Sequence, residues 1–261
     1  MVERPTHARR VALHAMVALV ACGQGLCVLE LLGVPLWPPR LVLGIESAVV
    51  LGAMLAALRR SPEPPELARW AAIGFGSWFI WGVLYFGAAR VTDPPSARIF
   101  NDAVLAKLPL VPAFTPVYLG VHVFSVVPYC AIPETRILRR YLLGNLLIVS
   151  LAAIAWVALP VRLDRPPIGA DLSGFGAWLL YAVYATDPTT NCFPSAHCSV
   201  AVYAAIGLRF GPRPLFVWGV ATALAVCVST LFTKQHYIAD VVVGAMLAGL
   251  MAFAITRRRK R

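Results

Sequence analysis

Charged residues are scarce in this chain of 261 residues, since Asp, Glu, Lys and Arg together make up 13% of it. Soluble domains average about a quarter. Acidic residues are the fewest, with 12 Asp and Glu against 23 Lys and Arg. Hydrophobic residues supply 59% of the chain, and the mean hydropathy is +0.75. This composition excludes an ordinary soluble domain and predicts an integral membrane protein.

Several patterns that identify other classes of protein are missing. The sequence has no internal repeat, no low-complexity tract and no phosphate loop of the G-x4-G-K-[ST] type. Five of the six cysteines fall in apolar stretches, and their spacing fits neither a disulfide framework nor a zinc site. Asp and Glu do not cluster at metal-ligand spacing on the predicted outer side. We therefore expect a protein that works without a metal and without a cofactor.

Eight apolar stretches are long enough to be considered membrane-spanning helices. They predict an all-α, polytopic membrane bundle, in which a polar, proline-rich break at 59–69 separates the first two helices from the other six. We expect an N-terminal helix pair over 1–62 and a six-helix catalytic core over 63–261. The eight stretches are 11–36, 41–58, 70–89, 115–133, 141–161, 195–209, 214–232 and 236–256.

The net charge of +11 does not indicate nucleic acid binding, because the basic residues lie in short clusters between the apolar stretches. An orientation with both termini in the cytoplasm places sixteen of the 23 Lys and Arg inside and seven outside, as the positive-inside rule requires. We expect a protein of the bacterial inner membrane. The longer outer segments, roughly 90–114 and 162–194, then lie on the periplasmic side.

Two ionisable residues mark the outer start of the last predicted helix. His236 and Asp240 are four residues apart, so they share one helix face, and the lean of helical side chains carries the carboxylate toward the imidazole. Such a carboxylate holds one ring nitrogen as N–H and leaves the other with a lone pair. This pattern predicts an activated histidine.

Residues from three distant stretches are predicted to meet on the outer face. His197 and His236 both open helices that run inward, and Arg162 and Arg165 follow the fifth predicted helix on that same side. Two helix N-termini with free amides, the two arginines and Lys234 would bind a multiply charged anion, of which phosphate is the best candidate.

These segments resemble the type-2 phosphatidic acid phosphatase superfamily, and more narrowly its branch related to inositol phosphorylceramide synthase. The resemblance covers roughly residues 69–261. The family's blocks read Lys-x6-Arg-Pro, Pro-Ser-Gly-His and Ser-Arg-x5-His-x3-Asp. They are represented here by Arg165-Pro166, by Pro194-Ser195-Ala196-His197, and by Ser229, His236 and Asp240.

The chain departs from the family pattern at three positions. The family lysine falls at Ala158, the arginine of the third block at Thr230, and the glycine of the second block at Ala196. Arg162 and Lys234 each lie four residues after a missing cation, one helical turn farther on. Our hypothesis is that these two residues replace the missing cations.

The resemblance implies a metal-free phosphoryl transfer in two steps, on a lipid-linked phosphate. His236 would attack phosphorus, Asp240 would orient it, and His197 would protonate the leaving oxygen. Water or the hydroxyl of a lipid or alcohol acceptor would then take the phosphoryl group. The predicted ligands of the phosphate oxygens are Arg162, Arg165, Lys234, Ser195 and the backbone amides near Ala196.

Several alternatives stay open at this point. The chain could be a transferase or a pure hydrolase of lipid phosphates or diphosphates, such as a phosphatidate, phosphatidylglycerophosphate or polyprenyl-phosphate phosphatase. It could also be a non-enzymatic lipid carrier or scramblase whose cations only bind head groups.

For several other polar residues, the sequence favours a structural role over a catalytic one. Glu30 and Glu46 are read as hydrogen-bonding or access-route residues, His122 as a core histidine, and Asp187 and Asn191 as caps or turn formers.

Overall fold

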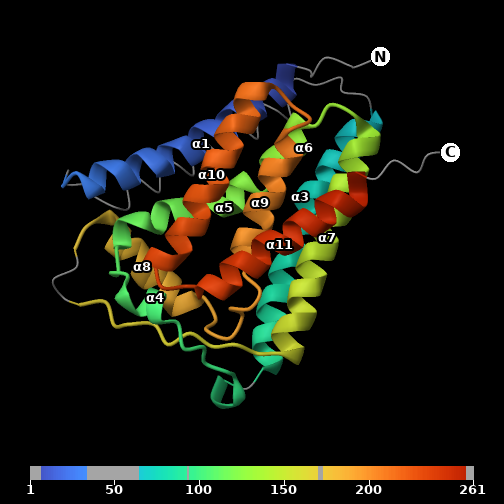
Figure 1. Cartoon of the computed structure of the whole chain (residues 1–261). Coiled ribbons are helices and arrows are strands. Elements are labelled where there is room, and N and C mark those ends of the chain that lie inside the picture. The colour runs from blue at the N-terminus through green and yellow to red at the C-terminus, as the bar shows by residue number, and fades with distance from the viewer. Residues whose placement is uncertain (1–6, 34–64, 93, 170–172, 257–261) are drawn as a thin grey trace.

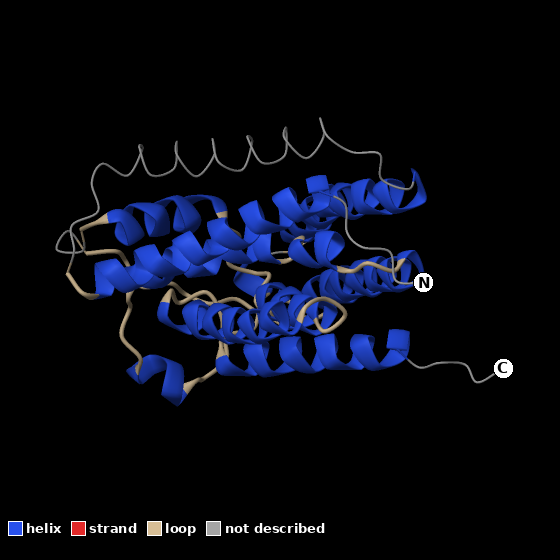
Figure 2. Ribbon diagram, turned by 90° about the horizontal axis from the view of Figure 1, so that it is seen from above, coloured by secondary structure: helices blue, strands red, loops and turns tan. Residues whose placement is uncertain are grey.

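The structure is a computed structural model that describes residues 7–33, 65–92, 94–169 and 173–256 (Figure 1). In these ranges it is built from helices joined by loops, with no strand, as Figure 2 shows. The all-α prediction is confirmed for this part of the chain. The elements are α1 (His7–Leu31), α3 (Pro65–Val91), η1 (Pro94–Ser96), α4 (Ala103–Lys107), η2 (Pro112–Phe114), α5 (Thr115–Phe124), α6 (Val127–Ala131), α7 (Thr135–Ala158), α8 (Phe175–Thr186), α9 (Ala196–Leu208), α10 (Arg213–Phe232) and α11 (Ile238–Thr256).

Three of the described helices are long and apolar enough to cross a membrane, judged by length and composition. They cover Leu13–Leu31, Thr135–Ala158 and Arg213–Phe232. Four shorter apolar helices accompany them, at Ile80–Val91, Phe175–Thr186, Ala196–Leu208 and Ile238–Ala254. The predicted span 41–58, the boundary near residue 62 and Glu46 lie outside the described residues. Eight crossings and cytoplasmic termini therefore stay predictions.

The predicted span 115–133 is not one uninterrupted helix. Helix α5 ends at Phe124, and α6 begins at Val127. Pro128 has no N–H to continue the helical ladder, and the Ser125 hydroxyl donates to the carbonyl of His122 at 3.0 Å. The chain therefore turns at Ser125 and Val126, and the backbone N–H groups of both residues still donate to carbonyls of α5.

Helix α9 forms the centre of the bundle, and eleven of its 13 residues are buried. Helices α10 and α11 pack along it, and α7 also contacts it. Small residues allow this close approach. At Gly219 of α10 an added Cβ would lie 2.6 Å from the Leu208 side chain. Because α9 is surrounded on all sides, its sequence is apolar almost throughout, apart from the residues at its start.

The starts of α9 and α11 are joined through their backbones. The Ser195 N–H, just before α9, donates to the carbonyl of Asp240 in α11 at 3.1 Å. One turn farther along α11, a Cβ at Gly244 would lie 2.6 Å from the Ser195 carbonyl oxygen and 3.1 Å from the Ser199 hydroxyl. Only glycine allows the two helices to approach this closely.

Three loops lie side by side at the same end of the bundle. Isolated parallel bridges pair Arg98 with Val161 and Val161 with Asn191. Two side chains fix the last loop to neighbouring helices. The Trp156 indole of α7 donates to the Pro194 carbonyl at 3.1 Å, and the Asn191 amide donates to the Tyr85 carbonyl of α3 at 2.6 Å. Asn191 is therefore a cross-link between loop and helix, and it holds the segment that leads into α9.

Helix α1 packs along α5 and α6 and is linked to α8 by Glu30. Both carboxylate oxygens of Glu30 accept from the Gly176 N–H, at 3.0 and 2.8 Å. A carboxylate at this place satisfies a free amide in the first turn of α8 and opposes the positive end of its dipole. This contact favours the structural interpretation of Glu30.

We predict that Gly244→Ala separates the starts of α9 and α11. The added methyl group has no space against the Ser195 carbonyl, so the substitution should cost about 1–3 kcal/mol of stability. It should lower the thermal unfolding midpoint of the purified protein in detergent.

Gly249→Ala in the same helix is the matched control, because nothing lies within 4 Å of its added Cβ. The alanine should stabilise α11 there by up to about 1 kcal/mol. Equal midpoints for the two variants would contradict the close-contact interpretation of Gly244.

Candidate active site

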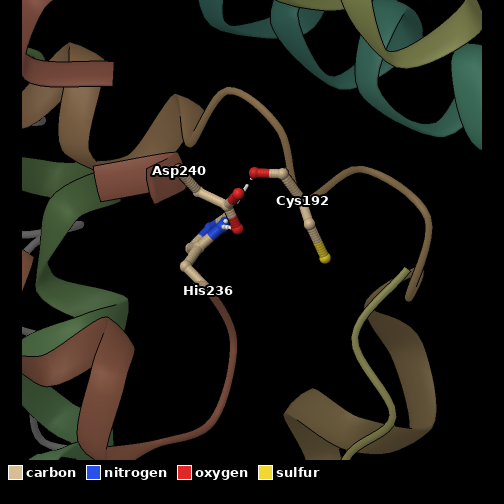
Figure 3. Close-up of side chains that lie close together, drawn as sticks. All are labelled: Cys192, His236 and Asp240. Atoms are coloured by element: carbon tan, nitrogen blue, oxygen red, sulfur yellow. Dashed lines mark hydrogen bonds and ion pairs between the residues drawn. The ribbon is translucent and has the colours of Figure 1, made fainter. Parts of the chain in front are cut away.

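His236 lies in the loop before α11 and is almost fully buried, with 4% of its surface exposed. Its Nδ1 lies 3.0 Å from the carbonyl oxygen of Cys192 and 3.4 Å from Oδ2 of Asp240. Figure 3 shows the Cys192 carbonyl directed at this pair. The imidazole is therefore held between a backbone carbonyl and a carboxylate.

These neighbours determine which tautomer His236 adopts. A carbonyl oxygen only accepts hydrogen bonds, so Nδ1 must carry the proton. The neutral ring then has its lone pair on Nε2, which is the nitrogen available to attack an electrophile. The shorter contact belongs to Cys192, so the backbone carbonyl holds the tautomer at least as firmly as Asp240 does.

Asp240 is completely buried and has several contacts at the start of α11. Its Oδ2 accepts from the Tyr237 N–H at 2.8 Å as well as facing His236. This bond fixes the carboxylate on the imidazole side of the helix. A buried carboxylate beside Nδ1 stabilises the imidazolium character that develops when Nε2 forms a bond.

His197 is the second residue of α9 and is 3% exposed. Its ring centroid lies 5.7 Å from that of His236. On its other side it stacks on Tyr118 at 4.4 Å and meets His122 edge-on at 5.6 Å. The structure thus brings together the two histidines that the sequence singled out, which are 39 residues apart in sequence.

Ser195 and Ala196 form the start of α9. The Ser195 hydroxyl accepts from the Cys198 N–H at 3.2 Å and so acts as the N-cap of the helix. Ala196 packs in an apolar cluster with Tyr85 and Trp156, among others. The methyl group that replaces the family glycine therefore fills space between α3, α7 and α9.

Arg165 is buried and forms an ion pair with Asp187. Its guanidinium donates to Oδ2 of Asp187 at 3.1 Å, to the Asp187 carbonyl at 2.8 Å and to the Pro188 carbonyl at 3.3 Å. Its Cζ also lies 5.2 Å from the centre of the Tyr184 ring. A guanidinium has five N–H donors, so these three bonds leave donors for a further anion.

The two proposed replacement cations also bind protein oxygens. The Lys234 ammonium donates to the carbonyls of Leu105 and Leu108, at 2.7 and 2.6 Å, at the C-terminal end of α4. Arg162 pairs with Asp164 at 2.9 Å, and its own carbonyl accepts from the Tyr237 hydroxyl at 3.0 Å. These contacts give both residues a structural role beside His236. Their phosphate role stays a prediction.

Cys192, His236 and Asp240 lie close enough to be considered as a metal site, with one potential ligand atom each within 4.8 Å of the others. Burial, followed by the nearby Asp240 charge, raises the pKa of the Cys192 thiol, so the sulfur stays protonated at neutral pH. The thiol faces the Thr189 carbonyl at 3.2 Å, and Nδ1 of His236 is a donor. The donor set therefore fits a hydrogen-bonded array better than a metal site.

Sequence reasoning missed several residues around the two histidines. Asp187 is the C-cap of α8, as predicted, and its N–H donates to the Val183 carbonyl at 2.8 Å. The sequence did not indicate that its carboxylate also accepts from Tyr85, Tyr118 and Arg165. The Cys192 carbonyl was also missed, because no side-chain pattern marks a backbone acceptor. The sequence offered one indication for Asp187, which is that it lies ten residues before His197, but this position does not identify its hydrogen-bond partners.

Asp102 is another missed residue, and it connects two helices. Its Oδ1 accepts from the N–H groups of Val104 and Leu105 at the start of α4, and its Oδ2 accepts from the Ile238 N–H at 2.9 Å. Burial alone would raise the pKa of Asp102. The three N–H donors and the Lys234 charge outweigh burial, so the pKa lies below its ordinary value.

Residues 141–261 match the family model of the PAP2 superfamily. The match begins in α7 and includes Arg165, His197, His236 and Asp240, but it does not extend back to residue 69 and does not distinguish a branch of the superfamily. No curated protein matches the chain.

We predict that Asp102→Asn destabilises the protein in a pH-dependent way. The amide cannot accept from Ile238 through its nitrogen, so the loss should be about 1–2 kcal/mol at pH 7. Because the folded-state pKa lies below the ordinary value of about 3.9, this contribution exists above that pH and is lost as the pH falls through the folded-state pKa. Unfolding midpoints between pH 3 and pH 8 measure it.

The control is Asp164→Asn, which removes an exposed ion pair worth at most about 1 kcal/mol. A difference between wild type and Asp102→Asn that stays constant over this pH range would contradict the proposed link.

Proposed function

We propose that the chain is an integral membrane enzyme that transfers or hydrolyses the phosphate of a lipid-linked substrate through a phosphohistidine on His236. The observation that carries the proposal is the hydrogen bond from Nδ1 of His236 to the Cys192 carbonyl. It leaves a lone pair on Nε2, and His197 lies on a facing helix with 5.7 Å between the ring centroids. The match to the PAP2 superfamily, whose members are phosphatases and phosphotransferases, supports this class of reaction.

The reaction has two balanced halves. Nε2 of His236 attacks phosphorus, the bond from phosphorus to the leaving oxygen breaks, and protonated His197 gives its proton to that oxygen. Water or another hydroxyl then gives its proton to His197 and attacks phosphorus. The P–N bond breaks, and its electron pair returns to Nε2. Asp240 stabilises the charged imidazole in the intermediate.

The phosphate oxygens need positive charge or N–H donors in the transition state. We assign this role to the remaining donors of Arg165, to the Ser195 hydroxyl and to the backbone amides near Ala196, with Arg162 and Lys234 as further predicted ligands. No metal takes part in the proposed reaction.

The proposed site faces away from the cytoplasm. The distribution of Lys and Arg supports this orientation, and the ends of α7 and α10 lie with the starts of α9 and α11 at one end of the bundle (Figure 1). We infer a location in the bacterial inner membrane with the site on the periplasmic side. Apolar helices around the site fit a lipid substrate.

The test is turnover by the purified protein in detergent with EDTA present. The substrates are lipid phosphates and diphosphates, and free phosphate and new lipid are both measured. His236→Ala should lower the rate at least about 10⁴-fold, as loss of a nucleophile does. His14→Ala in α1 is the control. A wild type that performs no better than His236→Ala would contradict the proposal and favour a carrier.

The two histidines should respond differently to the leaving group. His197→Ala should slow turnover of an alkyl phosphate by about 10²–10⁴-fold, because the leaving alkoxide needs a proton. The loss in kcat/KM should be much smaller with p-nitrophenyl phosphate, because kcat/KM reports the first half of the reaction and this leaving group needs no acid. His236→Ala should impair both substrates equally, and the reverse pattern would exchange the roles of the two residues.

A further inference from the structure

A cavity of about 610 Å³ lies beside His197, on the side of the Tyr118 ring. It is bounded by α3, α5, α8 and the start of α9. Its polar lining residues include Tyr85, Tyr118, His122, Asp187 and His197. A single water occupies about 30 Å³ of liquid volume, so this space is far larger than hydrolysis requires. Its volume is in the range of sites for small organic molecules.

One wall of the cavity is a connected set of hydrogen-bond acceptors. The Tyr85 hydroxyl donates to Oδ1 of Asp187 at 2.6 Å, and the Tyr118 hydroxyl donates to Oδ2 at 3.2 Å. Each phenol O–H donates a hydrogen bond to the carboxylate, so the lone pairs of each phenol oxygen can accept a hydrogen bond from a donor in the cavity. Arg165 compensates the carboxylate charge with its ion pair at 3.1 Å. The wall is therefore electrically balanced and rich in acceptors.

A wall of this kind favours hydroxyl groups over phosphate. An O–H group can donate to the phenol oxygens or to the remaining lone pairs of Asp187, whereas an anion would face a carboxylate. The lining also includes exposed apolar side chains, among them Val83 and Phe86 of α3, which are 71% and 50% exposed. The cavity thus suits a molecule or head group that carries both hydroxyls and carbon.

His197 connects this wall to the reaction. It lines the cavity, and its ring centroid lies 5.7 Å from that of His236. In the proposed reaction His197 protonates the leaving oxygen and later takes the proton of the incoming hydroxyl. Both oxygens must therefore occupy the same place, within reach of His197 and on the side of the phosphorus away from His236, and the rest of each alcohol can extend into the cavity.

We propose that Asp187, Tyr85 and Tyr118 form a hydroxyl-binding subsite for the alcohol portion of the phosphate ester. The subsite holds the leaving alcohol in the first half of the reaction and a hydroxyl-bearing acceptor in the second. In the second half the acceptor gives its proton to His197, its oxygen attacks phosphorus, and the P–N bond to His236 breaks. This inference rests on the proposed function, and it makes the protein a transferase to polyhydroxyl acceptors as well as a hydrolase.

The test compares two acceptors of equal carbon number in purified, full-length protein. Labelled phosphatidic acid is the donor, glycerol and 1-propanol compete with water, and glycerol phosphate, propyl phosphate and free phosphate are counted. Wild type should form glycerol phosphate in preference to propyl phosphate. Tyr85→Phe and Tyr118→Phe should each reduce that preference about fivefold, the effect of losing one hydrogen bond of about 1 kcal/mol.

A second experiment tests whether the subsite binds hydroxyls on the leaving alcohol of the phosphate donor. Phosphatidylglycerol phosphate has a hydroxyl on its leaving alcohol beside the scissile bond, whereas phosphatidic acid has none there. If the subsite binds the donor's head group, the two variants should lower the ratio of kcat/KM between these donors by a similar factor. All of these readouts are ratios within one preparation, so partial unfolding of a variant does not change them.

Tyr181→Phe in α8 is the matched control, because its hydroxyl binds the Ile168 carbonyl at 3.1 Å. It should keep the wild-type ratios. The subsite is contradicted if turnover depends on His236 while neither ratio changes in Tyr85→Phe or Tyr118→Phe. Turnover that survives in His236→Ala contradicts the proposed function instead, so the two failures are distinguishable.

Discussion

The backbone contact between the starts of α9 and α11 is the constraint on which the site depends. The Ser195 N–H binds the Asp240 carbonyl, and Gly244 allows the helices to approach. His197 follows Ser195 by two residues, and His236 precedes Asp240 by four. The positions of the two imidazoles are thus set by the start of α9 and by the loop residues directly before α11, within a buried core, and little depends on the rotamers of long side chains.

Main-chain carbonyls supply many of the polar contacts around this core. The Cys192 carbonyl accepts from His236, and the Pro194 carbonyl accepts from Trp156. Both carbonyls belong to the loop that leads into α9, and Asn191 fixes that loop to α3. A buried polar group must find a partner, and a loop with free carbonyls at the end of an apolar bundle provides such partners without further polar side chains. This explains how a chain so poor in charge can hold a buried histidine and carboxylate in one orientation.

The sequence was sufficient for features that depend on local spacing. The apolar stretches predicted the helices α3, α7, α9, α10 and α11 with shifts of a few residues at their ends. The i, i+4 spacing of His236 and Asp240 predicted that the two side chains would face each other, and they lie 3.4 Å apart. The predicted shared helix face was wrong, because α11 begins at Ile238 and His236 precedes it. The order of the blocks anticipated the superfamily match over 141–261, and the resemblance over 69–140 stays a prediction.

The rest could not be predicted because it depends on tertiary contacts between residues that are distant in sequence. The sequence offered Lys234 as a cation for phosphate, but its ammonium donates to the carbonyls of Leu105 and Leu108. These acceptors lie more than a hundred residues earlier in the sequence. The break between α5 and α6 depends on whether a helix continues through Pro128, which neighbouring helices decide. Asp187 had no periodic pattern to mark it, since its partners come from α3, α5 and the loop after α7.

The ion pair between Arg165 and Asp187 links the two sides of the proposed reaction. Arg165 is the cation that the resemblance assigns to phosphate, whereas Asp187 belongs to the wall of the cavity. Because the Arg165 guanidinium donates to the Asp187 carboxylate, a phosphate bound to Arg165 would weaken the ion pair between Arg165 and Asp187. Asp187 then becomes a stronger acceptor for the hydroxyls in the cavity. Binding of phosphate and binding of alcohol are therefore expected to favour each other, although neither ligand needs to touch both residues.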